Sequence, residues 1–283
     1  MGETEPYCIL RHGRKSHTWG ELRQAAGHTM RDAPWLGQNI DPERSERNAV
    51  LAGTGDVVED VQSRLAAVGV DPKPGQVVAR ELLLTASSSH FAAGGYSGRD
   101  GDFAPDHLNA WRAASMAFLR EEFGANLCTV VLHLDEAVPH LHAWVTTTAL
   151  VEKKGRGRPR KDGTRPAVTT GWTLNHDKVM GSGKAAFAAR QDRYAEAMAP
   201  LGLRRGQRQS QAHHEPIRAY YAADQGRRHG RLQELDQVSD FLAHVRPFFG
   251  PFFPFFPGDS IPSFALKRPE ALQYRLCKFY VLN

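Results

Sequence analysis

The sequence predicts an α+β fold: a largely antiparallel β-sheet with helices packed on it. Short β-branched runs alternate along the chain with amphipathic helical stretches, as at residues 76–85 and 105–123. Two apolar runs, 129–134 and 140–148, are separated only by a short stretch around Pro139, which indicates two antiparallel strands in a hairpin. The 283-residue chain is 41% hydrophobic, which is enough for the core of one large domain.

The elements before this hairpin are predicted from cap and breaker residues. Thr or Asp before an apolar stripe is typical of a helix start, and clusters of Gly, Pro and Ser are typical of loops. The helices are expected to cover one face of the sheet. The predicted order is a strand at 7–10, a helix from Trp19 to Arg31 after Thr18, a loop at 32–45, a helix capped by Asp56 and running to Val68, a strand at 76–85, a loop at 87–102 and a helix at 105–123.

After the hairpin the chain becomes basic. A basic loop is predicted at 152–167, where Arg156 and Arg158 stand in an RGRP segment with the pattern of a minor-groove hook. A loop lying along a phosphate backbone explains the same residues without base readout. Further helices are predicted at 184–199 and 216–222.

The composition changes again near residue 232. We expect one domain at 1–231 and a Phe- and Pro-rich C-terminal appendage at 232–283, poorly ordered for lack of any helical or strand period. The formal charge of +5 is unevenly spread, since residues 150–231 hold 18 Lys or Arg against 7 Asp or Glu. A basic third beside a near-neutral remainder indicates nucleic-acid binding, and a solvated basic face is the alternative.

The cysteines and the N-terminus indicate the cellular setting. Three cysteines without a CxxC pair indicate neither a disulfide framework nor a zinc ribbon, and they fit a reducing cytoplasm. The first residues lack a basic stretch before an apolar core, and no run approaches about 18 apolar residues. A cytoplasmic protein without a membrane span is expected.

The hairpin itself contains the most informative motif, HLDEAVPHLH at residues 133–142. A turn about 136–139 would set Asp135 opposite His140 and His133 opposite His142, with all three imidazoles on one face. Opposed positions about 5 Å apart and neighbours about 7 Å apart allow three ring nitrogens to converge on one metal ion. Three protein ligands leave coordination positions open, which is typical of catalysis or substrate binding. The alternative is three unrelated histidines satisfied by hydrogen bonds.

Four ordered blocks of sequence resemble the MobV-type plasmid relaxases, the Mob/Pre family of plasmid mobilisation and recombination proteins in the HUH endonuclease superfamily. The resemblance extends over roughly residues 7–222 and implies an HUH relaxase-like palm within 1–231. The matching blocks are AAGHTMRD with NIDPERSERN, RELLLTAS, HLDEAVPHLH and GLRRGQRQSQAHHEPIRAYYA.

The resemblance implies a site-specific enzyme that binds plasmid DNA at an origin of transfer, single-stranded and hairpin, in the bacterial cytoplasm. Such an enzyme nicks one strand by metal-dependent transesterification and stays attached to the 5′ end. His28 would be the catalytic nucleophile and Glu136 would act beside the ion. A divalent Mn²⁺ or Mg²⁺ would be held by His133, His140 and His142. Imidazole suits the nucleophile because much of it is neutral at physiological pH.

Four residues near His28 are candidates for contacts to DNA phosphates or for support of the site. Arg31 and Arg44 would grip flanking phosphates by bidentate hydrogen bonds. Asn39 and Asp41 would orient His28 or lie behind the metal ligands. A structural salt bridge between Arg44 and Asp41 is the alternative for that pair.

Other interpretations stay open from sequence alone. His28 can simply end its helix, where a cation is favoured, and Tyr7 is the best alternative nucleophile. A rolling-circle replication initiator of HUH type, which normally uses tyrosine, is one competing function. A non-enzymatic DNA-binding module with a structural metal is another. The family usually continues into a long helical C-terminal region, so contact with a coupling protein of the transfer apparatus is a further expectation, and the oligomeric state is undecided.

Overall fold

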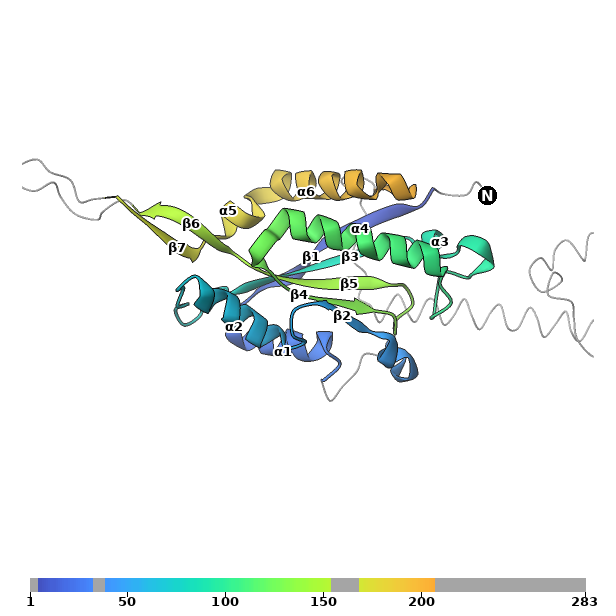
Figure 1. Cartoon of the computed structure of the whole chain (residues 1–283), viewed down its shortest axis with the longest axis horizontal. Helices are drawn as coiled ribbons and strands as arrows, with labels where there is room; N and C mark the ends of the chain where they lie inside the picture. Colours follow the sequence, from blue (N-terminus) through green and yellow to red (C-terminus); the bar gives the residue numbers. More distant parts are fainter. Residues whose placement is uncertain (1–4, 33–38, 154–167, 207–283) are drawn as a thin grey trace, which may run out of the picture. The chain divides into compact units, whose positions relative to one another are not determined.

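A six-stranded sheet forms the centre of the structure, a computed structural model, and confirms the predicted α+β class (Figure 1). The structure describes residues 5–32, 39–153 and 168–206, which belong to a unit spanning residues 1–210. Arg156, Arg158, the predicted helix at 216–222 and the tail at 232–283 lie outside the described residues. The predicted boundary after residue 231 therefore stays a prediction.

The strand order is β2-β4-β5-β3-β1-β8, and every neighbouring pair is antiparallel except β1 and β8. Two further strands, β6 and β7, pair with each other in a separate antiparallel sheet. The strands are β1 (Tyr7–His17), β2 (Ala49–Ala52), β3 (Ala79–Ala86), β4 (Leu127–His133), β5 (His140–Thr146), β6 (Thr148–Lys153), β7 (Thr169–Leu174) and β8 (Arg204–Arg205).

The helices form where cap residues and apolar stripes coincide. The backbone N–H of Thr18 donates to Glu21 (3.0 Å), and Asp56 accepts from the backbone N–H groups of Val58 and Glu59 (2.9 Å each), as the cap predictions require. The α-helices are α1 (Trp19–Thr29), α2 (Val57–Ala67), α3 (Ser88–Phe91), α4 (Pro105–Phe123), α5 (His176–Met180) and α6 (Gly183–Met198), with short 3₁₀ turns at Pro42–Arg47, Ala93–Gly95, Gly124–Asn126 and Ala199–Leu201.

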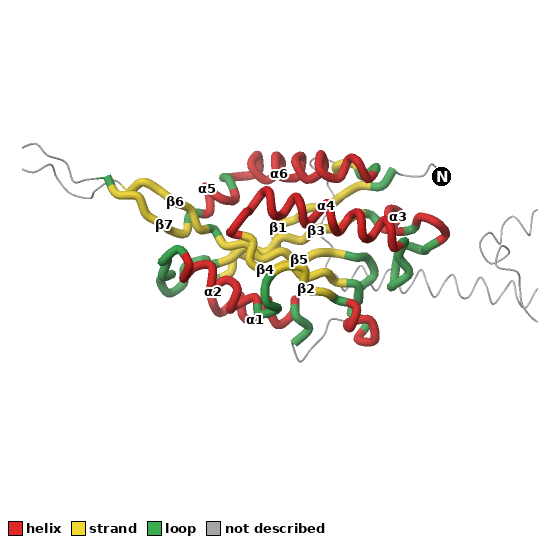
Figure 2. The backbone as a smooth tube through the Cα atoms, viewed as in Figure 1, coloured by secondary structure: helices red, strands yellow, loops and turns green. Residues whose placement is uncertain are grey.

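Helices cover both faces of the sheet, where the sequence predicted one covered face. Helices α4 and α6 lie on one side, and α1 and α2 lie on the other (Figures 1 and 2). The reason lies in the alternation of β5. Leu141 and Val145 pack under α4 and α6, whereas Trp144 points the other way and is buried against Leu22 of α1 and Val61 of α2.

Four strands, β2, β6, β7 and β8, escaped prediction because their sequences are short or lie beside interrupting residues. Strand β2 has four residues, and β8 has two. The predicted run at 140–148 divides at Thr147 into β5 and β6, and the first two residues of the predicted basic loop at 152–167 are part of β6. Among the described helices, none combines the length and the apolar character that a membrane crossing needs.

A buried hydrogen-bond network fixes α6 on α4. The indole N–H of Trp111 donates to the hydroxyl oxygen of Tyr194 (3.1 Å), and this hydroxyl also contacts Ser115 (3.0 Å). Trp111, Ser115 and Tyr194 are all buried. Burial raises the pKa of Tyr194, so the hydroxyl stays neutral.

We expect Tyr194→Phe to lower the free energy of unfolding by about 1–3 kcal/mol, because the indole N–H of Trp111 loses its acceptor inside the core. Urea denaturation measures the change. Tyr96→Phe is the matched control, since Tyr96 is exposed and should change stability by less than about 0.5 kcal/mol. Equal stability of the two variants would contradict this account of the network.

Candidate metal and catalytic site

The β4–β5 hairpin brings three buried histidines together at one end of the sheet. His133 pairs with His140, and Val131 pairs with His142. The predicted pairing of His133 with His142 was therefore wrong, because the connection comprises residues 134–139 and is two residues longer than expected. A shift of two residues preserves the side-chain alternation, so the three imidazoles still share one face.

The three rings, which we call the tripod, are close enough to bind one ion together. Their centroids lie 4.6–5.1 Å apart, and one nitrogen of each ring lies within 4.8 Å of the others. Each ring uses its other nitrogen for a hydrogen bond to a fixed group. These bonds join Nε2 of His133 to the Thr29 carbonyl (2.8 Å), Nδ1 of His140 to the Val138 carbonyl (3.0 Å) and Nδ1 of His142 to a carboxylate oxygen of Glu81 (2.5 Å).

These bonds determine where the ring protons lie. A carbonyl oxygen only accepts, so the bonded nitrogens of His133 and His140 are donors, and the remaining nitrogens keep a lone pair. Burial, together with the neighbouring imidazoles, lowers the pKa of His133 and His140. Neutral rings with fixed tautomers and inward lone pairs are the form in which histidine binds metals.

Arg31 lies at the acidic side of the tripod. Its Nε and Nη2 donate to the two oxygens of Asp135 (2.8 and 2.7 Å), and Nη2 also donates to Glu136 (2.9 Å). The side chains of Arg31 and Asp135 are only 8% and 0% exposed. Nη2 of Arg31 also lies 3.0 Å from Nδ1 of His133, so an ion bound at that nitrogen has to replace this hydrogen bond.

The charges around the tripod fit a divalent cation. Three carboxylates, those of Asp135, Glu136 and Glu81, contact Arg31 or a tripod imidazole. Arg31 is the one guanidinium bonded to them at the tripod among the described residues, which leaves two negative charges at neutral pH. The donor set of three imidazoles with carboxylates nearby suits Mn²⁺ as well as heavier first-row ions.

Arg31 adopts a backbone conformation that glycine usually takes. It follows the C-cap of α1 with a φ of 63°, and the N–H of Asp32 closes the helix end on the Gly27 carbonyl (2.9 Å). A left-handed residue other than Gly, Asn or Asp is strained. The hydrogen bonds of the Arg31 side chain to Asp135 and Glu136 offset that strain, which shows that its side chain is needed there.

His28 lies beside the tripod, as the resemblance implies. It is in the last turn of α1, half-buried, and its ring centroid is 6.3 Å from that of His142. Burial and the adjacent Arg31 lower the pKa of His28. A neutral imidazole at this position keeps a nitrogen lone pair available at physiological pH.

Asn39 and the pair Asp41 and Arg44 support the hairpin loop. Asn39 donates to Glu136 (2.6 Å), so it lies behind Glu136 and contacts no His28 atom in the bonds described. Arg44 donates to Asp41 (2.6 Å) and to the carbonyls of Leu134 and Glu136 (3.3 Å each). These contacts favour the structural salt bridge for Asp41 and Arg44, and phosphate binding by Arg44 stays a prediction.

Tyr7 lies away from this group. It begins β1, two strands from β5 in the sheet order, and its backbone pairs with Arg204 of β8. In the part of the chain that the structure describes, no hydrogen bond or ring contact joins Tyr7 to the tripod. The position of His28 is closer to the tripod than that of Tyr7.

Two supporting acids were missed from the sequence. Asp135 was noticed only as a carboxylate between histidines, yet it accepts from Arg31, Ser45 (2.8 Å) and Asn48 (2.7 Å). Glu81 was read as part of an ordinary strand, although an acid in the apolar run RELLLTAS is a signal of a specific partner. The glycine at position 13 leaves room for the Glu81 side chain, because a Cβ on residue 13 would lie only 2.8 Å from a Glu81 oxygen.

The sequence profile of the plasmid recombination enzyme family Mob_Pre matches residues 5–222. The chain belongs to this family. A 65 kDa protein of Zymomonas mobilis subsp. mobilis is 29% identical over 220 residues, which are 76% of this chain and 32% of that protein. The chain therefore spans about a third of the length of this relative.

Solved structures of the MobM relaxase domain, bound to oriT DNA of plasmid pMV158 and to Mn, have a similar fold. The structure at pH 6.8 aligns with a TM-score of 0.56 and 18% identity over 77% of this chain and 98% of MobM. The structure at pH 5.5 gives 0.55 and 19% over 77% and 99%. The likeness confirms the relaxase-like arrangement of the sheet and helices.

We expect Asp135→Asn to lower the free energy of unfolding by about 3 kcal/mol, because the buried guanidinium of Arg31 loses the more deeply buried of its two carboxylate partners and keeps only Glu136. Desolvation raises the pKa of Asp135, but hydrogen bonds from Arg31 and Asn48 outweigh it and hold the pKa well below its usual range. The carboxylate therefore stabilises the fold above pH of about 4, its unfolded pKa, and this contribution is lost as the pH falls towards the folded pKa.

Urea denaturation of the metal-free protein at several pH values measures this effect. The difference between Asp135→Asn and the unsubstituted protein should shrink below pH of about 4. Asp41→Asn is the matched control, because the Asp41 side chain is 40% exposed whereas that of Asp135 is fully buried, so its loss should cost much less stability. A loss as large in Asp41→Asn would show that burial is not the cause.

Proposed function

We propose that this chain is a plasmid mobilisation relaxase, which binds an origin of transfer and nicks one DNA strand with His28 as the nucleophile. The observation that supports it most directly is the position of His28 beside the three clustered imidazoles of the tripod at the end of the hairpin. Membership of the plasmid recombination enzyme family points to the same reaction. MobM, of similar fold, is bound to oriT DNA and Mn.

The tripod is the site for a divalent ion, Mn²⁺ or Mg²⁺. His133, His140 and His142 would hold it, with Glu136 next to His140 (3.6 Å between Oε1 and Nε2). Once bound, such an ion withdraws electron density from the scissile phosphate and stabilises negative charge in the transition state. Glu81 and the carbonyls of Thr29 and Val138 keep the three rings in one orientation, which lowers the reorganisation that binding requires.

His28 attacks the phosphorus of one phosphodiester. A ring nitrogen forms the new N–P bond as the bond from phosphorus to the 3′-oxygen breaks, so the protein is joined to the 5′ end as a phosphoramidate. The released strand ends in a 3′-hydroxyl after that oxygen takes up a proton. Attack of a 3′-hydroxyl on the same phosphorus reverses the step, so the intermediate can rejoin DNA ends.

Arg31 and Glu136 prepare the site for an anionic substrate. Arg31 brings the one guanidinium bonded to the carboxylates at the tripod among the described residues, and Nη2 can turn from His133 to a phosphate oxygen. Asn39 steadies Glu136 through its side-chain amide. Arg44, Arg156 and Arg158 stay candidates for phosphate contacts further along the DNA. The reaction belongs in the bacterial cytoplasm, where plasmid DNA is processed.

The competing functions lack a specific observation in their favour. A rolling-circle initiator with a tyrosine nucleophile needs a tyrosine at the tripod, and Tyr7 lies two strands away from β5. A purely structural ion needs a closed set of ligands, whereas three imidazoles leave positions for substrate. Contact with a coupling protein of the transfer apparatus stays a proposal.

Single-stranded oligonucleotides tiled across the DNA that flanks the gene, incubated with the protein and Mn²⁺, should give a denaturation-resistant adduct on the 5′ end of one cleaved strand. We expect His28→Ala to lower adduct formation by at least about 10³-fold, because the substitution removes the imidazole that would form the bond to phosphorus. The adduct of the unsubstituted protein should be acid-labile, as a phosphoramidate is.

Tyr7→Phe is the matched control and should form the adduct at the unsubstituted rate. An adduct that survives His28→Ala and disappears with Tyr7→Phe would transfer the nucleophile to tyrosine. If no adduct forms with any divalent ion and any flanking DNA, the non-enzymatic DNA-binding module is the function that remains.

Glu81→Gln tests the support of the tripod without touching the nucleophile. We expect the affinity for Mn²⁺ to fall by about 10-fold or more, since the amide is a weaker acceptor for Nδ1 of His142 and carries no charge. Isothermal titration with Mn²⁺ alone measures this change without DNA. Glu122→Gln is the control, because Glu122 pairs with Arg190 and Arg193 away from the site. Unchanged affinity in Glu81→Gln would remove Glu81 from the metal support.

A further inference from the structure

A second surface with binding character lies on the separate two-stranded sheet of β6 and β7, which we call the arm. In Figure 1 the arm extends past the end of the six-stranded sheet. Leu150 of β6 and Trp172 of β7 pair directly, so their side chains share one face. They are 47% and 39% exposed, which is unusual for such large apolar side chains on one small sheet.

The inner part of the same face of the arm packs against the core, whereas the outer part is exposed. Thr148 pairs with Leu174, and Leu174 packs against the core formed with α2. The apolar face therefore continues outward from the core to Leu150 and Trp172 without a covering element among the described residues. Packing against the core therefore does not explain why large apolar side chains stand at positions 150 and 172.

Trp172 is held in place by Arg64 of α2. The guanidinium carbon of Arg64 lies 5.4 Å from the centre of the indole ring, and Nη2 of Arg64 donates to the Thr148 hydroxyl (3.1 Å). Because Arg64 is bonded to the arm itself, the indole is positioned before any ligand arrives. An ordered, exposed aromatic ring loses little entropy when a flat group stacks on it.

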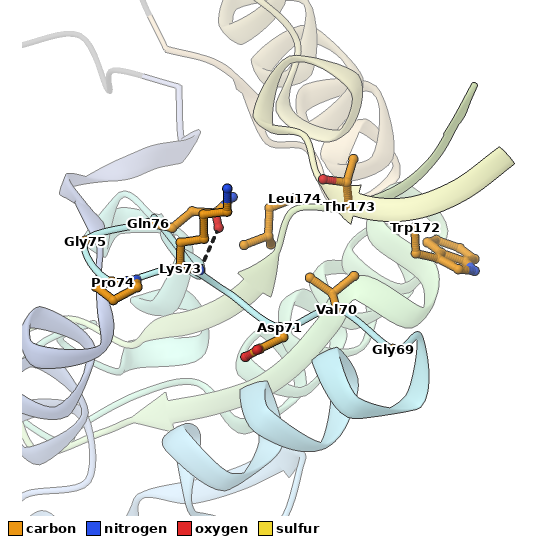
Figure 3. A pocket seen from close by; sticks show the side chains of 10 residues that line it. All are labelled: Gly69, Val70, Asp71, Lys73, Pro74, Gly75, Gln76, Trp172, Thr173 and Leu174. Atoms are coloured by element: carbon orange, nitrogen blue, oxygen red, sulfur yellow. Dashed lines mark hydrogen bonds between the residues drawn. The ribbon is translucent and has the colours of Figure 1, made fainter. Parts of the chain in front are cut away.

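A hollow of about 620 Å³ adjoins the ring (Figure 3). The loop at 69–76 lines one side, and Trp172 with Leu174 lines the other. Lys73 and Gln76 point into it, and the backbone N–H of Lys73 donates to the side chain of Gln76 (3.1 Å), which closes a firm turn. Asp71 also lines the hollow, so the bordering side chains are of both charges.

From these contacts we infer that the arm is a second DNA-binding site, where Trp172 stacks on a base of single-stranded DNA. The inference rests on the proposed function for its partner. An exposed aromatic ring with Arg64 over it, and with Lys73 on the other side of the adjoining hollow, is a combination that suits binding of single strands without sequence preference.

The arm is remote from the tripod. Leu150 follows His142 by eight residues along β5 and β6, which at about 3.3 Å per residue places the arm roughly 25 Å from the reacting phosphate. A short DNA that fills the tripod end cannot reach Trp172, whereas a longer one can. The contribution of the arm should therefore depend on DNA length and leave the chemical step unchanged.

Fluorescence anisotropy with labelled oligothymidines of about 3 and about 20 nucleotides tests this on the full chain. We expect Trp172→Ala to weaken binding of the longer DNA by about 10-fold and to leave the shorter DNA unaffected. Trp172→Phe should recover most of the loss, because a phenyl ring still stacks. Tyr96→Ala, which removes an equally exposed aromatic ring elsewhere, should bind both like the unsubstituted protein.

Equal affinity of Trp172→Ala and the unsubstituted protein for the longer DNA would overturn the inference, as would an equal loss for both lengths. If the arm instead binds a second copy of the chain, sedimentation will show self-association that Trp172→Ala removes, with DNA binding unchanged, and the inference fails. At saturating DNA, the adduct yield of Trp172→Ala should match the unsubstituted protein. If neither the unsubstituted protein nor Trp172→Ala forms an adduct, the proposed function fails. The dependence of binding on DNA length still decides the role of the arm in that case.

Discussion

The contact between Arg31 and Asp135 determines the geometry of the whole site. It joins the end of α1 to the start of the hairpin connection, two segments about a hundred residues apart in sequence, through two hydrogen bonds in a buried position. His28 lies three residues before Arg31, and His133 lies two residues before Asp135. One ion pair thereby places the proposed nucleophile beside the proposed metal ligands. A helix free to slide on the sheet would not keep that register.

This arrangement also explains why so much charge is tolerated in a buried place. Asp135 receives four hydrogen bonds from three side chains, two from Arg31 and one each from Ser45 and Asn48, which replace the water that burial removes. The imidazoles of His133 and His140 avoid the same penalty by staying neutral, as their lowered pKa values show. The remaining excess of negative charge comes from Glu136 and Glu81, and it faces the inward nitrogens. A cation is the group that would complete this balance.

The sequence predicts those parts of the fold and site that depend on local pattern. The caps at Thr18 and Asp56 and the alternation across the hairpin involve residues close in the chain, and they were predicted correctly. The predicted register of the hairpin was wrong because the register depends on the conformation of residues 134–139. Contacts of Arg44 and Asp135 with residues distant in sequence fix that conformation. Glu81 was missed for the same reason, since its partner His142 is 61 residues away.

The grouping of His28 with the tripod came from family resemblance, and the physical basis for it appears only in three dimensions. His28 alone is an ordinary residue at a helix end, and the strained φ of Arg31 is invisible in the sequence. That strain persists only because the side chain of Arg31 is bonded to Asp135 and Glu136. A glycine at position 31 would relax the backbone and close the helix equally well, but it would leave two carboxylates next to His133 without a counter-charge. At position 31, an arginine therefore contributes the positive charge of the site at the expense of local backbone stability.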